Sequence, residues 1–191
     1  MEKIASKKSL NVAGVLLFVF AVQFTIMLFI TEALYHGYSI ANNYISDLGV
    51  GPTGFLFDTS ISVLGIAVIA SAFFLYRGFD VKVFPILLGL TGVGALLVGV
   101  FNESYGALHG YVSDLTFIMG PLTAIYAYRY QTSPFKFMSV ALGVVSYIAI
   151  IFYMFFGSPI IGVGGWERLI VYPFLLWGIG YGAFLTGLSY K

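Results

Sequence analysis

Hydrophobic residues form six long runs along the chain, and short polar stretches separate them. We predict membrane-spanning segments at approximately 10–34, 55–76, 84–101, 111–129, 136–157 and 168–189. Each run is close to the ~20 residues with which an α-helix crosses ~30 Å of hydrocarbon. Because lipid offers no partners to backbone amides and carbonyls, each run is expected to be helical. The pattern therefore predicts an all-α, polytopic membrane protein, with residues 1–191 forming one six-helix transmembrane domain.

The connections between these runs favour an up-down bundle. Residues 77–83 and 130–135 are short links, and short links place consecutive helices antiparallel. The connection at 35–54 is the longest, and it is long enough to fold over the mouth of the bundle. The first run exceeds the ~7–15 apolar residues of a secretory signal, so we interpret it as a retained span.

Composition excludes several classes of protein. The chain is 60% hydrophobic and 9% charged, with a mean hydropathy of +0.97, whereas soluble domains carry about 25% charged residues. It contains no cysteine, which excludes a disulfide, a thiolate metal site and a cysteine nucleophile. The sequence has no phosphate-loop or nucleic-acid-binding motif. We therefore expect a multi-pass protein of the cell membrane that has lipids, and no nucleic acid, among its partners.

Charged residues separate strongly between the two ends of the predicted bundle. The end with the N-terminus carries eight of the nine Lys and Arg residues and two acids: Lys3, Lys7, Lys8, Arg77, Lys82, Arg129, Lys136 and Lys191, with Glu2 and Asp80. The other end carries the remaining six acids and one cation: Glu32, Asp47, Asp58, Glu103, Asp114 and Glu167, with Arg168. Because cytoplasmic loops are rich in Lys and Arg, this separation predicts cytoplasmic N- and C-termini.

The acid-rich end also holds both histidines, and we predict an outward-facing polar pocket there. Its members are expected to be Asp47, Glu103, His109, Glu167 and Arg168, with Glu32, His36, Asn43 and Asp58 beside them. Residues four apart share a helical face, so Glu32 would lie near His36 if the first helix extends that far, and His109 near Ser113. Asp58 lies one turn into the second run and should face the bundle.

Two adjacent residues open the last run. Glu167 is expected in the first turn of that helix, where the helix dipole favours a negative charge. Arg168 is the one cation expected among the six acids, and two roles stay open for it. Its guanidinium can hold two carboxylates and tie the last helix to earlier ones, or it can hold one carboxylate and an anionic lipid head.

The residue types at this end also permit hydrolytic chemistry. A serine nucleophile needs a base within reach and an acid that orients the base. Ser46 or Ser113, His109 and Asp47 supply these types, so a membrane-embedded lipid hydrolase using His109, Asp47 and Ser46 is the alternative function. A zinc ion would take His36, His109 and a carboxylate. No His-Glu-x-x-His pair supports such a site, so we predict no metal and no cofactor.

Three stretches resemble the DUF998 family of integral membrane proteins, which is common in archaea and bacteria. The first joins His-Gly-Tyr-Ser at 36–39 to Asn-Tyr-Ile-Ser-Asp-Leu-Gly at 43–49, the second is Gly-Ala-Leu-His at 106–109, and the third is Gly-Gly-Trp-Glu-Arg-Leu-Ile-Val-Tyr-Pro at 164–173 with Trp177. The resemblance covers essentially the whole chain and implies six spans in this order. Because the family is one of unknown function, it implies no reaction.

Two departures from the family's usual pattern bear on the site. The family usually has Phe-Asn-Ser where this chain has Phe57-Asp58-Thr59, and often Phe-Pro-Glu where it has Phe101-Asn102-Glu103. Both departures argue against fixed catalytic roles for Asp58 and Asn102. The chain is more faintly similar to Frag1-type membrane proteins and to ceramidase-type hydrolases, which use a Ser, an Asp and three His. This chain has two His, which argues against a complete zinc site of that kind.

These observations predict an integral membrane protein whose outward-facing pocket binds a lipid head group. A second interpretation is a subunit of a membrane complex or of a homo-oligomer, because the chain has almost no soluble loops. Transport is disfavoured, since the centres of the spans hold almost no ionisable residues.

Overall fold

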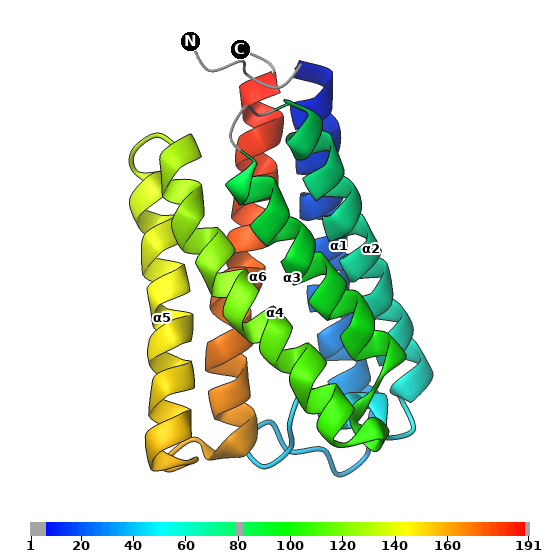
Figure 1. Cartoon of the computed structure of the whole chain (residues 1–191). Helices are drawn as coiled ribbons and strands as arrows, with labels where there is room; N and C mark the ends of the chain where they lie inside the picture. Colours follow the sequence, from blue (N-terminus) through cyan, green and yellow to red (C-terminus); the bar gives the residue numbers. More distant parts are fainter. Residues whose placement is uncertain (1–6, 79–81, 190–191) are drawn as a thin grey trace.

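The computed structural model describes residues 7–78 and 82–189, and within them every regular element is helical (Figure 1). The long helices are α1 (Lys7–Leu34), α2 (Gly54–Gly78), α3 (Val83–Val100), α4 (Ala107–Tyr126), α5 (Phe135–Phe156) and α6 (Gly162–Ser189). Three short 3-10 helices lie in or beside the connections: η1 (Ser46–Gly49), η2 (Glu103–Tyr105) and η3 (Ala127–Tyr130). The predicted all-α class with six helices is confirmed.

The six helices form a closed ring. Each one packs against the next along the chain, and α6 returns to pack against α1, as Figure 1 shows. Glycines permit the closest of these contacts. A methyl group on Gly14 of α1 would lie 2.6 Å from the carbonyl oxygen of Gly182 on α6, and one on Gly65 of α2 would lie 2.4 Å from the backbone nitrogen of Leu96 on α3. Small residues therefore bring helix backbones together, as they do between helices in lipid.

Five of the six helices have the length and composition to cross a membrane, and α4 falls short. Polar residues in the first three turns of α4, among them His109, Ser113, Asp114 and Thr116, lower its hydropathy. The predicted span at 111–129 is thus a helix that begins earlier, at Ala107, and ends at Tyr126. Its crossing of the membrane stays a prediction.

The start of α6 differs most from the predicted boundaries. The expected span began at residue 168, whereas the helix begins at Gly162. Glycine has low helix propensity, so the residue types at Gly162, Gly164 and Gly165 do not indicate a helix. The packing explains the glycines, because a methyl group on Gly164 would lie 2.0 Å from the carbonyl oxygen of Asn43. Glycine is required here so that the first connection can lie directly on α6.

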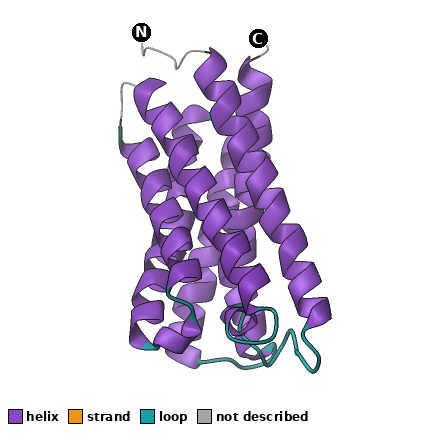
Figure 2. Cartoon of the chain, turned by 90° about the vertical axis from the view of Figure 1, so that its right-hand side faces the viewer, coloured by secondary structure: helices purple, strands orange, loops and turns teal. Residues whose placement is uncertain are grey.

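That connection, residues 35–53, is called loop 1 below. It crosses one end of the ring, as the loops at the bottom of Figure 2 show. The expectation that it folds over the mouth of the bundle is confirmed by its hydrogen bonds to α6 and to the α3–α4 connection. The opposite end carries the described cations at the α2–α3 and α4–α5 links, namely Arg77, Lys82, Arg129 and Lys136. Glu2, Lys3, Asp80 and Lys191 lie outside the described residues.

Candidate functional site

Loop 1 is ordered by its own polar side chains. The carboxylate of Asp47, in η1, accepts hydrogen bonds from Nδ2 of Asn43 at 2.9 Å and from the backbone nitrogen of Tyr44 at 2.8 Å. The hydroxyl of Tyr38 donates to the carbonyl oxygen of Tyr44 at 2.7 Å. Asp47 therefore shapes the turn that precedes η1, which is a common role for an Asp in a loop.

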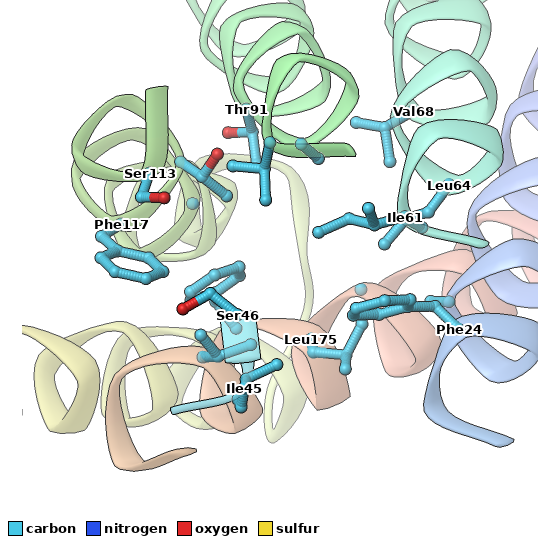
Figure 3. A pocket seen from close by; sticks show the side chains of 18 of the residues that line it. Phe24, Ile45, Ser46, Ile61, Leu64, Val68, Thr91, Ser113, Phe117 and Leu175 are labelled. Atoms are coloured by element: carbon cyan, nitrogen blue, oxygen red, sulfur yellow. The ribbon is translucent and has the colours of Figure 1, made fainter. Parts of the chain in front are cut away.

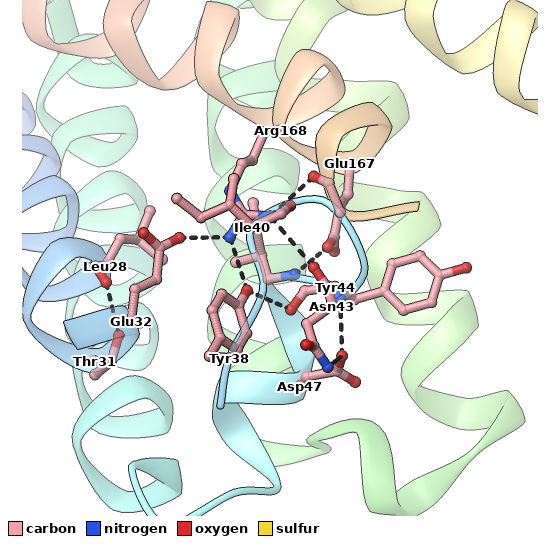
Figure 4. A network of polar contacts seen from close by, with 12 residues as sticks. Leu28, Thr31, Glu32, Tyr38, Ile40, Asn43, Tyr44, Asp47, Glu167 and Arg168 are labelled. Atoms are coloured by element: carbon pink, nitrogen blue, oxygen red, sulfur yellow. Dashed lines mark hydrogen bonds and ion pairs between the residues drawn. The ribbon is translucent and has the colours of Figure 1, made fainter. Parts of the chain in front are cut away.

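Arg168 attaches this loop to the bundle, as Figure 4 shows. Its Nη1 donates to the carbonyl oxygens of Ile40 at 3.0 Å and Gly164 at 2.9 Å. Its Nη2 donates to Oε1 of Glu32 at 2.5 Å and to the hydroxyl of Tyr38 at 2.7 Å. The side chain is 8% exposed, so the ion pair with Glu32 offsets the cost of burying the charge. Of the two roles left open by the sequence, these contacts support the architectural one.

Glu167, the residue before Arg168 on α6, also binds loop 1. Its carboxylate accepts a hydrogen bond from the backbone nitrogen of Ile45. Because α6 begins at Gly162, Glu167 lies in the second turn of the helix, and its expected place in the first turn is wrong. The side chain therefore acts through its contact with loop 1 rather than through the helix dipole, whose influence falls off within the first turn.

Glu103 lies in η2, within the α3–α4 connection, and is close to Asp47 of loop 1. Burial, together with the nearby carboxylate of Asp47, raises the pKa of Glu103 to about 7. A nearby carboxylate disfavours the ionisation of a second one, because the two negative charges repel each other. The short helices η1 and η2 pack against each other at the mouth of the ring.

Another attachment of loop 1 lies next to Glu103, at Asn102. Nδ2 of Asn102 donates to Oδ2 of Asp58 at 2.9 Å and to the carbonyl oxygen of Gly49 at 3.2 Å. Asp58 thus faces the α3–α4 connection, in agreement with the expectation that it points into the protein. Asn102 and Asp58, the two departures from the family's usual pattern, contact one another directly.

His109 lies in the first turn of α4 and is 8% exposed. Its Nδ1 is 2.8 Å from the carbonyl oxygen of Phe101, and its Nε2 is 3.2 Å from the hydroxyl oxygen of Ser113. A carbonyl only accepts, so Nδ1 carries the hydrogen in the neutral ring, and Nε2 accepts from Ser113. Both ring nitrogens are therefore engaged, and Asp47 is not the group that orients the imidazole. The predicted His109–Ser113 neighbourhood is confirmed.

His36 does not join this group. Helix α1 ends at Leu34, so His36 lies in an exposed turn beyond it and does not share a helical face with Glu32. Across residues 7–78 and 82–189, no three His, Asp or Glu side chains are grouped so that they could hold a metal ion.

An apolar cavity of about 90 Å³ lies inside the ring beneath loop 1 (Figure 3). Its polar residues are Ser46, Thr91, His109, Ser113, Thr116 and Glu167. The remaining walls are aliphatic and aromatic side chains from α1, α2, α3, α4 and α6, with Ile45 from loop 1. On α1 the lining runs from Phe24 to Leu17, which is ~15 to ~26 Å from the end of that helix at 1.5 Å per residue. The cavity therefore reaches deep into the bundle, and most of its polar residues come from loop 1 or from the helix turns next to it.

Sequence reasoning missed several partners that build this end. Tyr38 and Tyr44 support loop 1, and the backbone oxygens of Ile40 and Phe101 bind Arg168 and His109. A carbonyl oxygen is present at every residue, so no pattern of side chains could identify those two. The loop tyrosines carried a weak signal, since they lie within the first stretch that resembles DUF998.

The fold and this site define an all-α membrane protein with a buried polar cluster at one end. A model of the family described as "Protein of unknown function (DUF998)" matches residues 12–183, and the chain belongs to that family. No curated protein and no solved structure matches the chain. The fainter similarities to Frag1-type and ceramidase-type proteins stay predictions.

Proposed function

We propose that this protein crosses the membrane six times and binds a single-chain amphipathic lipid in the cavity beneath loop 1. The observation that carries the proposal is the make-up of the cavity wall, which is mostly apolar but includes the polar side chains of His109, Ser113 and Ser46. An acyl chain would lie among the apolar walls, and the lipid's polar head would meet these three side chains. Ligand sites commonly combine an apolar lining with a few placed polar groups.

The orientation in the membrane belongs to the same proposal. Loop 1 would face the outside, since the described links at the opposite end carry Arg77, Lys82, Arg129 and Lys136. The chain has no cysteine, so in whole cells each single-cysteine variant has one thiol of its own to label, and the purified protein shows whether that thiol reacted. We expect an impermeant maleimide to label Ser104→Cys and to leave Ser133→Cys unlabelled. The reverse result would place the cavity's polar end in the cytoplasm.

A photoactivatable lysophospholipid, with a diazirine in its acyl chain, tests binding in the cavity. We expect irradiation to label residues that line the cavity, such as Leu64 and Phe117. Ala95→Phe on α3 should reduce this labelling at least tenfold, because Ala95 lines the cavity and the added ring would occupy the space. Val100→Phe is the matched control, since Val100 is on the same helix and is 51% exposed. Equal labelling in both variants, or labelling confined to the outer surface, would contradict the proposal.

Ester hydrolysis is a second candidate function, and the 3.2 Å contact between Ser113 and Nε2 of His109 favours it. The Ser113 oxygen would attack an ester carbonyl carbon while its proton passes to Nε2. The ester C–O bond would then break, and the leaving alkoxide would take that proton. Water would release the fatty acid from the acyl-serine. The Phe101 carbonyl would orient the ring in place of the predicted Asp47.

Release of fatty acid from lysophospholipid by purified protein separates the two functions. We expect binding to survive in Ser113→Ala, since a methyl side chain preserves the shape of the cavity. If the protein is a hydrolase, Ser113→Ala and His109→Gln abolish turnover, whereas Ser46→Ala, which removes a hydroxyl from the same cavity, retains it. If the unmodified protein releases no fatty acid under conditions in which the photoactivatable lipid labels the cavity, hydrolysis is rejected and binding remains the proposed function.

A further inference from the structure

The cavity beneath loop 1 stops inside the bundle at a similar depth on each of the helices that line it. On α1 the deepest lining residue is Leu17, on α3 it is Leu88, and on α6 it is Gly178. These three residues are ~26, ~18 and ~24 Å from the ends of their helices next to loop 1, at 1.5 Å per residue. The cavity therefore has a floor, which is defined here by these residues and Trp177.

Packed aromatic side chains lie beyond the floor. Trp177 lines the cavity, whereas Tyr181, one turn further along α6, does not. The Trp177 ring stacks on the ring of Tyr181 with centroids 5.1 Å apart, and Tyr181 packs edge-on against Phe84 at 5.2 Å. Tyr181 and Phe84 are 1% and 0% exposed. Trp177 is thus supported from behind, and the cavity cannot continue past it unless this cluster is displaced.

Two hydrogen bonds in series fix the orientation of Trp177. Its Nε1 donates to Oγ of Ser139 on α5 at 3.0 Å, and that hydroxyl donates to Oε1 of Gln131 at 2.5 Å. A serine hydroxyl has one hydrogen to donate, so it accepts from the indole and donates to the amide. Helix α5 contributes no side chain to the cavity lining. The indole is therefore held from outside the cavity, and its rotation would leave a buried N–H without a partner.

The distance from loop 1 to the floor matches the hydrocarbon of one leaflet. Glu167 lines the cavity where α6 contacts loop 1, and Trp177 lines it ten residues further along the helix, which is ~15 Å along the axis. One leaflet contributes about half of the ~30 Å hydrocarbon thickness. With its tail against Trp177, a chain longer than this would push its head group past the polar side chains under loop 1.

We propose that Trp177 sets the length of the longest acyl chain that the cavity accepts. The inference rests on the proposed function, because it assigns a chain length to the lipid bound in that same cavity. The ligand class becomes a single-chain lipid whose acyl chain is about as long as those of the surrounding membrane. Trp177 acts as a specificity-determining residue that contacts the end of the tail and takes no part in chemistry at the head.

Competition against the photoactivatable lysophospholipid measures this limit. Unlabelled lysophosphatidylcholines, from lauroyl to behenoyl, compete at equal concentration for labelling of Leu64 and Phe117. With the unmodified protein we expect competition to improve up to palmitoyl or stearoyl and to be at least fivefold weaker for behenoyl. Trp177→Ala should remove this penalty, because it opens space at the floor. Trp166→Ala is the matched control, since Trp166 is on the same helix and does not line the cavity.

A substitution that raises the floor tests the inference from the opposite direction, and it decides the matter if Trp177→Ala does not fold. A methyl group on Gly178 would meet only Cβ of Ala21, at 3.9 Å, so a side chain there has room to enter the deep end of the cavity. Gly178→Val should therefore move the optimum to lauroyl or myristoyl. Gly180→Val is the matched control, because Gly180 is exposed and a methyl group there would have no atom within 4 Å.

The outcomes separate this inference from the proposed function. A folded Trp177→Ala variant that still discriminates against behenoyl, an unchanged optimum in Gly178→Val, or equal shifts in the control variants would each overturn the role of Trp177 and leave lipid binding in place. If the photoactivatable lipid does not label the cavity of the unmodified protein, the proposed function is rejected and this inference is rejected with it.

Discussion

The two ends of the bundle use cationic side chains in opposite ways. At the loop 1 end, Arg168 is buried and bonded to a carboxylate and to backbone carbonyls. At the other end, Arg77 and Lys136 lie over the rings of Phe73 and Tyr128, at 5.5 and 5.2 Å from their centroids. The first arrangement fixes a long loop in place. The second covers aromatic surface and leaves the charge free to meet water or lipid head groups.

Removal of Arg168 should therefore have the largest effect of any single charge. Arg168→Ala leaves Glu32 buried without a partner and releases the carbonyls of loop 1, so we expect a loss of ~3–5 kcal/mol in the free energy of unfolding. Arg129→Ala is the control at the opposite end, where the guanidinium lies over the ring of Tyr126. Its expected loss is below ~1 kcal/mol. Thermal unfolding in detergent measures both, and similar losses would mean that the two ends do not differ.

Asp47→Ala should rank second. It removes the acceptor for Asn43 and for the backbone nitrogen of Tyr44. Hydrogen bonds to a charged group contribute ~1.5–3 kcal/mol, and we expect a loss of that size. Hydrogen exchange should rise within residues 35–53 and stay unchanged in α5. The exposed acid Asp114, changed to Ala, should alter neither measurement, and an effect equal to that of Asp47 would argue against a specific role for the loop.

The raised pKa of Glu103 predicts how stability depends on pH. The pKa of Glu103 is raised from 4.5 to about 7, so the folded protein holds a proton that the unfolded chain releases. The free energy of unfolding should therefore fall as pH rises from about 4.5 to 7 and then level off. Because the group is partly exposed, the effect should be smaller than that of Asp47→Ala. Glu103→Gln should flatten this dependence in thermal unfolding from pH 4 to 8, and an unchanged slope would assign it to another group.

The smallest effect should come from the end with the short links. Lys136→Gln removes a cation that lies over the rings of Tyr128 and Phe137. Exposed contacts of this kind contribute ~0.5–1 kcal/mol, so the melting temperature should change by only a few degrees. A loss as large as that of Arg168→Ala would show that the cations at this end also hold the fold together.

The sequence predicted the helices far better than the contacts at their ends. Hydrophobic runs require only a count of apolar residues, and all six helices were placed within a few residues, apart from the start of α6. That start was missed because Gly162 and Gly164 indicate a loop unless the backbone packed against them is known. Glu32, Asp47, Glu167 and Arg168 do lie at one end, whereas His36 stays apart, and the pairing of these residues depends on loop 1. The carbonyl groups of loop 1 that bind Arg168 cannot be identified from the residue types, because every residue has a carbonyl group.

Arg168 binds loop 1 mainly through backbone carbonyl oxygens, and this has an evolutionary consequence. The side chain of Ile40 is 57% exposed, while its carbonyl oxygen receives the guanidinium. Selection can therefore replace such side chains freely, provided that the backbone path survives.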